Sequence, residues 1–456
     1  VCWGSNSLKA SAPNADGTIT VTLTVDNQKG FLCSDTYLVA TVESVKLGVS
    51  ISSKGDHTIA WNVTGLTEAE HHDVMTRGIR FFFLPDGTLA QIGNIINTAL
   101  LFLPELTKGV SESAAARNMD FLAKYANVHM KNRTIHEVDI DESTIQSGDF
   151  FGIIRLDGLD PMLGWAMGST TGHTTVALRE NGTLYIAEST ATDSYWAVNG
   201  IQRTPYKQWI TQAKAAGFQV VHAPLGAKAA ANFDEDKANA WFKTVEGYNY
   251  GYHNMLFGWI DTLEDNYPCV APNYTQCLSW ETVTILFGLV DKIAPTASDL
   301  IFNAAMNQRL NTTDLRMAEL LQTADEKGIV AETIPTIVEE DSFVYNTTRY
   351  GKVTNGPSMV CCVFVCHTWK EAGVFGDMAD EINCAEQTNY DDYVRNFLDT
   401  PTRPQQCVTA DPDNQLCQLL GDYTLNLNDY ATLAPYPHMD EKCPSEAPDY
   451  KRPANC

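Results

Sequence analysis

The sequence is poor in positive charge. Lysine and arginine total 31 of the 456 residues, against 56 aspartate and glutamate residues, which gives a formal net charge of −25 at pH 7. A field of this sign repels phosphate backbones and anionic lipid surfaces. We therefore expect no nucleic acid among the partners of this protein.

Long hydrophobic runs are also missing. No stretch approaches the roughly 18 apolar residues that a membrane-spanning helix needs, and the nearest runs, at 99–103, 283–290 and 359–366, have the length of ordinary helices or strands. The chain contains no internal repeat and no low-complexity tract. With 44% hydrophobic and 19% charged residues, the composition is that of a globular protein long enough for two domains. We expect no membrane span.

The cysteines lack the spacing of a metal site. Five of the twelve lie beyond residue 380, none of these forms a CxxC pair, and His438 is the only histidine among them. Zinc is therefore the weaker interpretation, and we expect neither a metal nor a cofactor. A cysteine cluster in a segment rich in Pro, Asp and Asn favours disulfides instead. The disulfide candidates are Cys2, Cys33, Cys269, Cys277, Cys384, Cys407, Cys417, Cys443 and Cys456.

Cysteine parity constrains the pairing. Cys2 with Cys33 and Cys269 with Cys277 are the economical local pairs. The five cysteines of the C-terminal segment cannot pair among themselves, so one of them is expected to bond to Cys362 or Cys366. The other of these two is expected to stay buried and reduced.

Six N-x-T sequons accompany the cysteines and fit an oxidising, glycosylating compartment. The chain also begins at Val1 rather than Met, as a chain does after removal of a signal peptide. We expect a secreted protein or one of the lysosomal or phagosomal lumen, and a cytosolic protein with accidental sequons is the alternative. The sequon asparagines are Asn62, Asn132, Asn181, Asn273, Asn311 and Asn346.

Hydrophobic periodicity divides the chain into three parts. Residues 18–25 alternate strictly between apolar and polar side chains, and similar strand patterns follow, which predicts an antiparallel β domain over residues 1–110. Strand and helix patterns then interleave over 111–375, which indicates an α+β domain with an insertion after residue 260. Residues 376–456 lose the periodicity and read as a tail pinned by disulfides.

A cysteine at the start of a helix is the first candidate for chemistry. Gly356-Pro357 ends the preceding structure, Ser358 is a good N-cap and Gly373 a good C′ residue, so a helix is expected over 359–372. Cys361 would then lie at position N3, where free N–H groups and the helix dipole lower the pKa of a thiol. A buried structural cysteine is the alternative interpretation.

A histidine and a glutamate lie on a predicted hairpin. Asn181-Gly182 between two alternating runs predicts a two-residue type I′ turn, which places Glu180 opposite Thr183. In this register His173 and Glu188 share one face of the hairpin, about 7–8 Å apart at the backbone. A carboxylate at that position can orient the imidazole, as in a Cys-His-acid site. Two solvated residues on a half-exposed hairpin are the alternative.

These motifs together resemble the circularly permuted papain-like amidases of the NlpC/P60 superfamily, the YiiX-like group. The resemblance lies in the order of the motifs, with the histidine and its acid on early strands and the cysteine on a later helix. The motifs run Gly148-Asp149-Phe-Phe-Gly-Ile-Ile, Gly172-His173-Thr-Thr-Val-Ala, Tyr185-Ile-Ala-Glu188, Gly247-Tyr-Asn-Tyr250 and Ser358-Met-Val-Cys361-Cys-Val-Phe-Val. The resemblance covers about residues 145–375.

The resemblance implies a role for each matched residue. Cys361 would be the nucleophile, His173 the general base and Glu188 the orienting residue, with the backbone N–H of Cys361 at the oxyanion site. The chain departs from the pattern in having Cys362 where the family usually has Ser. The insertion between Tyr250 and Cys361 is a second departure.

The sequence thus predicts a cysteine hydrolase with an α+β, circularly permuted papain-like domain between a β domain and a disulfide-pinned tail. Its substrate would be an amide, in a peptide, an isopeptide or a peptidoglycan stem peptide, cleaved through a thioester. A lipid amidase or acyl-ester hydrolase is the alternative enzyme, and a non-catalytic structural or ligand-binding glycoprotein is the alternative without chemistry. His253 is a rival base, and His71-His72 is a weaker candidate for metal binding.

Overall fold

The chain divides into two compact units, each built from two separate stretches. A computed structural model describes residues 2–30, 35–42, 44–84, 110–191, 196, 198–255, 280–399 and 403–435. The first unit consists of Val1–Ala99 and Ser279–Ile334, and the second of Leu100–Leu278 and Pro335–Cys456. Both units combine helices with antiparallel sheets, so the α+β expectation is confirmed at this level. Asn273 and five cysteines lie outside the described residues: Cys33, Cys269, Cys277, Cys443 and Cys456.

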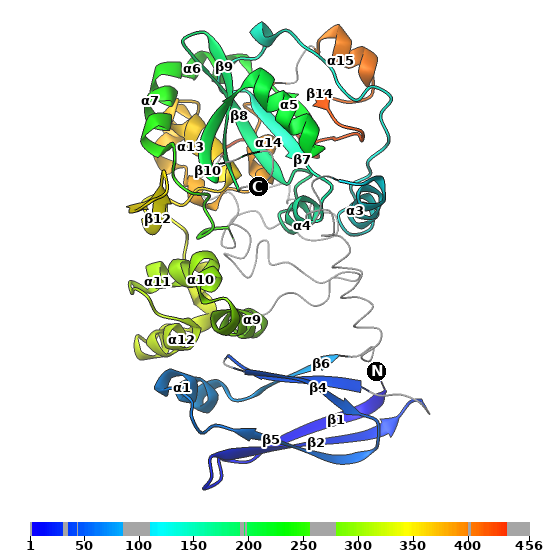
Figure 1. Cartoon of the computed structure of the whole chain (residues 1–456), viewed down its shortest axis with the longest axis vertical. Helices are drawn as coiled ribbons and strands as arrows, with labels where there is room; N and C mark the ends of the chain where they lie inside the picture. Colours follow the sequence, from blue (N-terminus) through cyan, green and yellow to red (C-terminus); the bar gives the residue numbers. More distant parts are fainter. Residues whose placement is uncertain are drawn as a thin grey trace. The chain divides into compact units, whose positions relative to one another are not determined.

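The first unit contains the β structure expected near the N-terminus (Figure 1). Two three-stranded antiparallel sheets, ordered β1-β2-β5 and β4-β3-β6, share an apolar core of two clusters, one with Val21 and Val39 and the other with Leu23 and Tyr37. The alternation predicted for residues 18–25 is confirmed, because Ile19, like Val21, points into that core. The strands are β1 (Trp3–Ala10), β2 (Thr18–Gln28), β3 (Asp35–Thr41), β4 (Ser44–Ile51), β5 (Gly55–Asn62) and β6 (Arg80–Leu84).

Helices from the later stretch complete the first unit, whereas the sequence placed them in the second domain as its insertion. They group with the β sheets because α12 packs against α1. At this contact Asp325 accepts a hydrogen bond from Arg77 (2.7 Å) and pairs with His72 (2.8 Å). The helices are α1 (Glu68–Arg77), α9 (Trp280–Ile293), α10 (Pro295–Ser298), a π-helical turn η3 (Asp299–Asn303), α11 (Ala304–Leu310) and α12 (Met317–Glu326). A 3₁₀ helix, η4 (Ala331–Thr336), follows.

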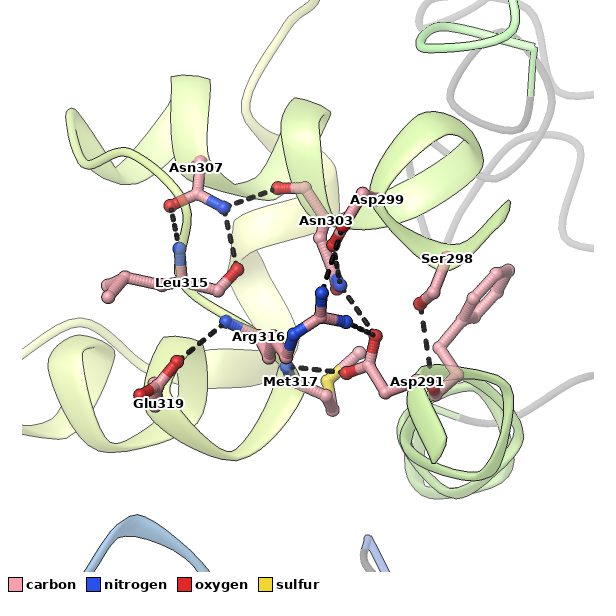
Figure 2. A network of polar contacts seen from close by, with 10 residues as sticks. Asp291, Ser298, Asp299, Asn303, Asn307, Leu315, Arg316, Met317 and Glu319 are labelled. Carbon is pink, nitrogen blue, oxygen red and sulfur yellow. Dashed lines mark hydrogen bonds and ion pairs between the residues drawn. The ribbon is translucent and has the colours of Figure 1, made fainter. Parts of the chain in front are cut away.

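A polar network fixes the connections between these helices (Figure 2). Arg316 donates to Asp299 at 3.0 Å and to Asp291 at 3.4 Å, so one guanidinium bridges the carboxylates of two helical elements. The Asn303 amide also donates to Asp291, at 2.7 Å. Asn307 then closes the turn before α12 through its hydrogen bond to the Leu315 carbonyl (2.8 Å). Hydrogen bonds between charged groups are stronger than neutral ones, so the network holds four helical elements together.

The second unit is built around a six-stranded antiparallel sheet ordered β10-β9-β8-β7-β11-β14. Its strands are β7 (Phe150–Ile154), β8 (His173–Glu180), β9 (Thr183–Thr190), β10 (Gly200–Pro205), β11 (Gln219–Ala223) and β14 (Cys417–Leu420), and a separate hairpin consists of β12 (Tyr345–Arg349) and β13 (Lys352–Gly356). The helices are α3 (Glu112–Tyr125), α4 (Leu159–Ala166), α5 (Tyr206–Ala216), α6 (Ala227–Asn232), α7 (Glu235–Val245), α13 (Cys361–Glu371), α14 (Asn389–Val394) and α15 (Gln405–Ala410), with 3₁₀ turns η2 (Glu142–Thr144), η5 (Gly376–Glu381) and η6 (Cys384–Glu386).

The sheet is buried on both faces. On one face, Val176 and Leu178 of β8 pack with Phe364 of α13 in one core, which α7 and α3 also join. On the other face, Ala177 packs in a second core that contains Trp209 of α5. Because neighbouring residues of a strand point to opposite faces, one strand contributes to both cores.

The segment after residue 375 is part of the second unit and not a tail, so this part of the sequence interpretation is wrong for the residues that the structure describes. β14 pairs with β11 as the edge strand of the sheet, and Tyr390 and Tyr393 of α14 lie in the core beside α13. The segment lacks a visible period because its helices and strand are only three to six residues long.

Two disulfides hold this segment. Cys366 of α13 is bonded to Cys384, as expected for a cysteine that reaches back to the helix, and Cys407 is bonded to Cys417. Cys2 is also disulfide-bonded. The sequon asparagines within the described residues are all exposed: Asn62, Asn132, Asn181, Asn311 and Asn346. Among the described residues, no helix combines the length and the apolarity that crossing a membrane demands.

The cysteine arrangement leads to a prediction for peptide mapping of the unreduced protein. The Cα atoms of the two pairs lie 5.5 and 5.2 Å apart, within the range that a disulfide bridges. We expect Cys366 joined to Cys384, Cys407 joined to Cys417, and Cys361 and Cys362 recovered as thiols. Mapping of a denatured, alkylated sample checks this, and a bridge to Cys361 would contradict it.

Candidate active site

The β8–β9 hairpin has the predicted turn and register. Asn181 and Gly182 have φ angles of 51° and 79°, as a type I′ turn requires, and Glu180 lies opposite Thr183. The paired residues run from this turn to Val176 opposite Ala187. Both strands continue past that pair, to His173 and Thr190, so β8 and β9 part at the end where His173 lies.

Glu188 holds the ring of His173. The Nε2 atom of His173 lies 2.9 Å from one carboxylate oxygen of Glu188, and the indole N–H of Trp209 donates to the other oxygen at 3.0 Å. Glu188 is fully buried. A carboxylate fixed in this way orients the imidazole and stabilises its protonated form. Because Nε2 faces Glu188, Nδ1 is the ring nitrogen that faces the thiol.

The cysteine helix begins two residues later than expected. The N-cap of α13 is Val360 (φ −75°, ψ 177°), so Cys361 is the first helical residue and not the third. The carbonyl of Met359 accepts hydrogen bonds from the Gly251 N–H (3.0 Å) and the Ser189 hydroxyl (2.7 Å), which keep residues 359–360 extended. The Ser358 hydroxyl bonds to Asn254 instead of capping the helix.

The Cys361 sulfur lies among polar groups from three elements. It is hydrogen-bonded to His173 and to the backbone N–H of Thr174 on β8, and to Cys362 of its own helix. Its distance to the Asn389 side-chain oxygen on α14 is 3.5 Å. Cys361 retains 4% of its accessible surface. As the first helical residue, it also presents a backbone N–H that no carbonyl within the helix can accept.

These contacts favour an ion pair. The hydrogen bond with Cys362, together with the bond to His173 and its positive charge, overcomes the effect of burial and lowers the pKa of the Cys361 thiol well below its usual value. Burial disfavours a charged imidazole, but hydrogen bonds and negative charge from Cys361 and Glu188 outweigh this effect and raise the pKa of His173 to about 10. Both shifts favour a thiolate beside an imidazolium.

Three further polar residues reach the site from the segment that the sequence interpretation left outside the catalytic domain. Gln387, Asn389 and Asp392 are all buried, and Asn389 contacts the thiol directly. A capping box between Thr388 and Asp391 begins α14, and this T-x-x-D pattern was the one visible sign of a helix here. The disulfide at Cys384 joins the segment to α13 just before these residues.

A second acidic group lies near His173. Burial and the neighbouring Asp157 raise the pKa of Asp160 on α4 to about 8. Asp160 can lie this close to residue 172 only when that residue is glycine, because a Cβ there would lie 2.3 Å from the Asp160 Cβ. Trp165, on the same helix as Asp160, packs edge-on against Phe121.

The rival candidates lie elsewhere. His253 stacks on the Tyr345 ring at 4.7 Å, and burial lowers its pKa to about 4. His72 pairs with Asp325 in the first unit. Among the described residues, Asp341, His367 and Cys384 form the one group with potential metal-ligand atoms within 4.8 Å of one another. The Cys384 sulfur is in a disulfide and is not a thiolate ligand.

No family model, curated protein or solved structure matches this chain. What the site can do chemically follows from its own geometry. A cysteine at a helix N-terminus, an imidazole and a buried carboxylate are the residue types that the roles of nucleophile, proton carrier and orienting group require.

The extended residues before α13 lead to a prediction about Gly251. A Cβ at this position would lie 2.3 Å from the backbone N and C atoms of Met359. We expect Gly251→Ala to lower the free energy of unfolding by about 2 kcal/mol and to slow the alkylation of Cys361 by iodoacetamide, because the clash moves the thiol away from His173.

Gly351→Ala is the matched control. Gly351 has a φ of 73° and no atom within 4 Å of an added Cβ, so this variant is expected to cost about 1 kcal/mol and to leave the alkylation rate unchanged. Urea unfolding and mass spectrometry of the Cys361 peptide provide the two measurements. Equal alkylation rates in Gly251→Ala and the unmodified protein would contradict the positioning role of Met359.

Proposed function

We propose that this protein is a cysteine hydrolase that cleaves an amide bond through a thioester, on a circularly permuted papain-like domain. The observation that carries the proposal is the contact of Cys361, at the first turn of α13, with His173, which Glu188 holds at 2.9 Å. The order of these residues along the chain, His173 and Glu188 on adjacent strands before Cys361 on a helix, supports the permuted arrangement.

The first half of the reaction forms the acyl-enzyme. The Cys361 thiolate attacks the carbonyl carbon, a C–S bond forms, and the negative charge on the oxygen develops near the unpaired backbone N–H of Cys361. The His173 imidazolium then gives its proton to the amide nitrogen as the C–N bond breaks. The products are a thioester on Cys361 and a free amine, and His173 is left neutral.

The second half restores the enzyme. Neutral His173 takes a proton from water as the water oxygen bonds to the thioester carbon, and the C–S bond breaks. The carboxylic acid leaves, and Cys361 and His173 return to the thiolate and imidazolium forms. Glu188 holds the ring in one orientation through both halves, since its second oxygen is fixed by Trp209.

An amide substrate fits the pair better than an ester does. An amine is a poor leaving group until it is protonated, and the raised pKa of His173 keeps a proton available next to the nucleophile. Peptide, isopeptide and peptidoglycan stem-peptide bonds are the substrate classes we propose, and the lipid amidase or ester hydrolase is the alternative enzyme. A non-catalytic role through a disulfide-blocked nucleophile is disfavoured, because Cys361 is a thiol.

A secreted or lysosomal location completes the proposal. The disulfides Cys366–Cys384 and Cys407–Cys417 are of the kind that persists in an oxidising compartment, and the exposed sequons are accessible to glycosylation.

The thiolate is expected to show itself in the pH dependence of alkylation. An ordinary thiol, with a pKa of about 8.5, loses reactivity about tenfold per pH unit on acidification. Because the pKa of Cys361 is lowered, we expect its reaction with iodoacetamide at pH 5.5 to stay within about threefold of the rate at pH 7.5. His173→Ala, the control, should restore the steep dependence. A steep dependence in the unmodified protein would count against the ion pair.

Two substitutions test the division of roles. With p-nitrophenyl acetate as the acyl probe, Cys361→Ala should form no acyl-enzyme, and Glu188→Gln should react about 10 to 100 times more slowly because the ring loses its charged partner. Glu180→Gln, at the turn end of the same hairpin, is the control and should react at the original rate. Acyl-enzyme is measured by intact mass. Undiminished acylation in Cys361→Ala would refute the assignment.

A further inference from the structure

Asp392 is a buried acid that the mechanism above does not use. It lies on α14 with no exposed surface. One carboxyl oxygen, Oδ1, accepts a hydrogen bond from the Gln387 amide at 2.5 Å. The other oxygen, Oδ2, is sealed from solvent and forms no hydrogen bond of regular geometry with the described residues. An ionised carboxylate with one unsatisfied oxygen is costly in such a place.

The charges around Asp392 favour its neutral form. Burial raises its pKa well above the usual value, and the negative charge of Cys361 adds to this effect, although hydrogen bonding from Gln387 and Thr174 opposes it. Arg395 is the cation that opposes the shift, yet its guanidinium lies over the rings of Phe375 (5.0 Å) and Phe397 (5.9 Å). Within the described part of the chain, Asp392 takes part in no ion pair. When it is protonated, the second oxygen is a hydrogen-bond donor.

Thr174 provides the matching acceptor. Its hydroxyl oxygen is also sealed from solvent, and the Asp392 carboxyl is the polar side chain that it interacts with. Thr174 follows His173 on β8, at the end where β8 and β9 part, and its backbone N–H is hydrogen-bonded to the Cys361 sulfur. The side chain and the backbone of one residue thus connect Asp392 to the nucleophile.

We propose that Asp392 is a positioning residue of the catalytic site, which acts as a neutral carboxylic acid. Its Oδ2–H donates to the Thr174 hydroxyl and so holds the Thr174 N–H on the sulfur of Cys361. This inference rests on the proposed function. The link depends on a hydrogen-bond donor that is free of negative charge, since an ionised carboxylate would repel the thiolate.

Substitutions at position 392 can separate the effect of a hydrogen-bond donor from the effect of a negative charge. Asparagine has the shape of aspartic acid, and its amide can donate to Thr174 while its oxygen accepts from Gln387. Leucine has a similar volume and can do neither. Asp392→Asn should therefore retain the function of Asp392, and Asp392→Leu should lose it.

The experiment measures the rate of Cys361 acylation by p-nitrophenyl acetate at pH 7 in the full chain. We expect Asp392→Asn to react within about threefold of the unmodified protein and Asp392→Leu to react at least about tenfold more slowly, a difference of about 1.4 kcal/mol or more. Recovery by the conservative variant is the decisive readout, because a loss of packing alone would not follow the hydrogen-bond donor.

Thr174→Val provides a second route to the same link. It should slow acylation as Asp392→Leu does, and the double variant Asp392→Leu/Thr174→Val should be no slower than either single variant. The control is Thr204→Val, a buried threonine on β10 of the same sheet, which should react at the original rate. If Asp392→Leu does not fold, as judged by thermal unfolding, Thr174→Val alone decides.

The two levels of the proposal fail separately. Equal rates for Asp392→Asn and Asp392→Leu, or an original rate in Thr174→Val, would overturn the role of Asp392 while Cys361→Ala remained inactive. Acylation that persists in Cys361→Ala would instead reject the proposed function.

Discussion

The candidate site of the second unit is organised around the Cys361 sulfur, in the opening where β8 and β9 part. A continuous hairpin would pair the N–H of Thr174 with the neighbouring strand, and there it is bonded to sulfur instead. The start of α13 reaches this opening because Gly251 and Ser189 hold the Met359 carbonyl. Strand β8, the start of α13 and the loop that contains Gly251 together determine the position of the Cys361 sulfur.

Two buried acids flank this thiol in different ways. Glu188 meets an imidazole and an indole N–H, so both of its oxygens have donors and its negative charge is matched. Asp392 meets one amide and a hydroxyl, with no ion pair among the described residues, and this environment favours the proton. Burial is similar for the two side chains, and they differ in the groups that face their oxygens. If Asp392 is neutral, as proposed, a protein with a net charge of −25 keeps one negative charge away from its nucleophile.

Local sequence patterns predicted those parts of the site that local interactions determine. Asn181-Gly182 was sufficient for the register that brings His173 and Glu188 to one face. Ser358 was misleading as a helix cap, because its partner, Asn254, is distant in the sequence. The contribution of Asn389 and Asp392 was missed, since a six-residue helix has too few turns to show a period. Such contacts depend on which segments meet in space, and spacing along the chain does not encode this.

The division of each unit into two stretches has a consequence for synthesis. The helices that complete the first unit lie at residues 280–326, after most of the strands of the second unit. The edge strand β14 of the second unit lies later still, at Cys417–Leu420. A chain that emerges from the ribosome in order therefore completes neither unit before synthesis has entered its last third, and the early sheets keep apolar surface exposed until then. No single cut in the chain separates one whole unit from the other.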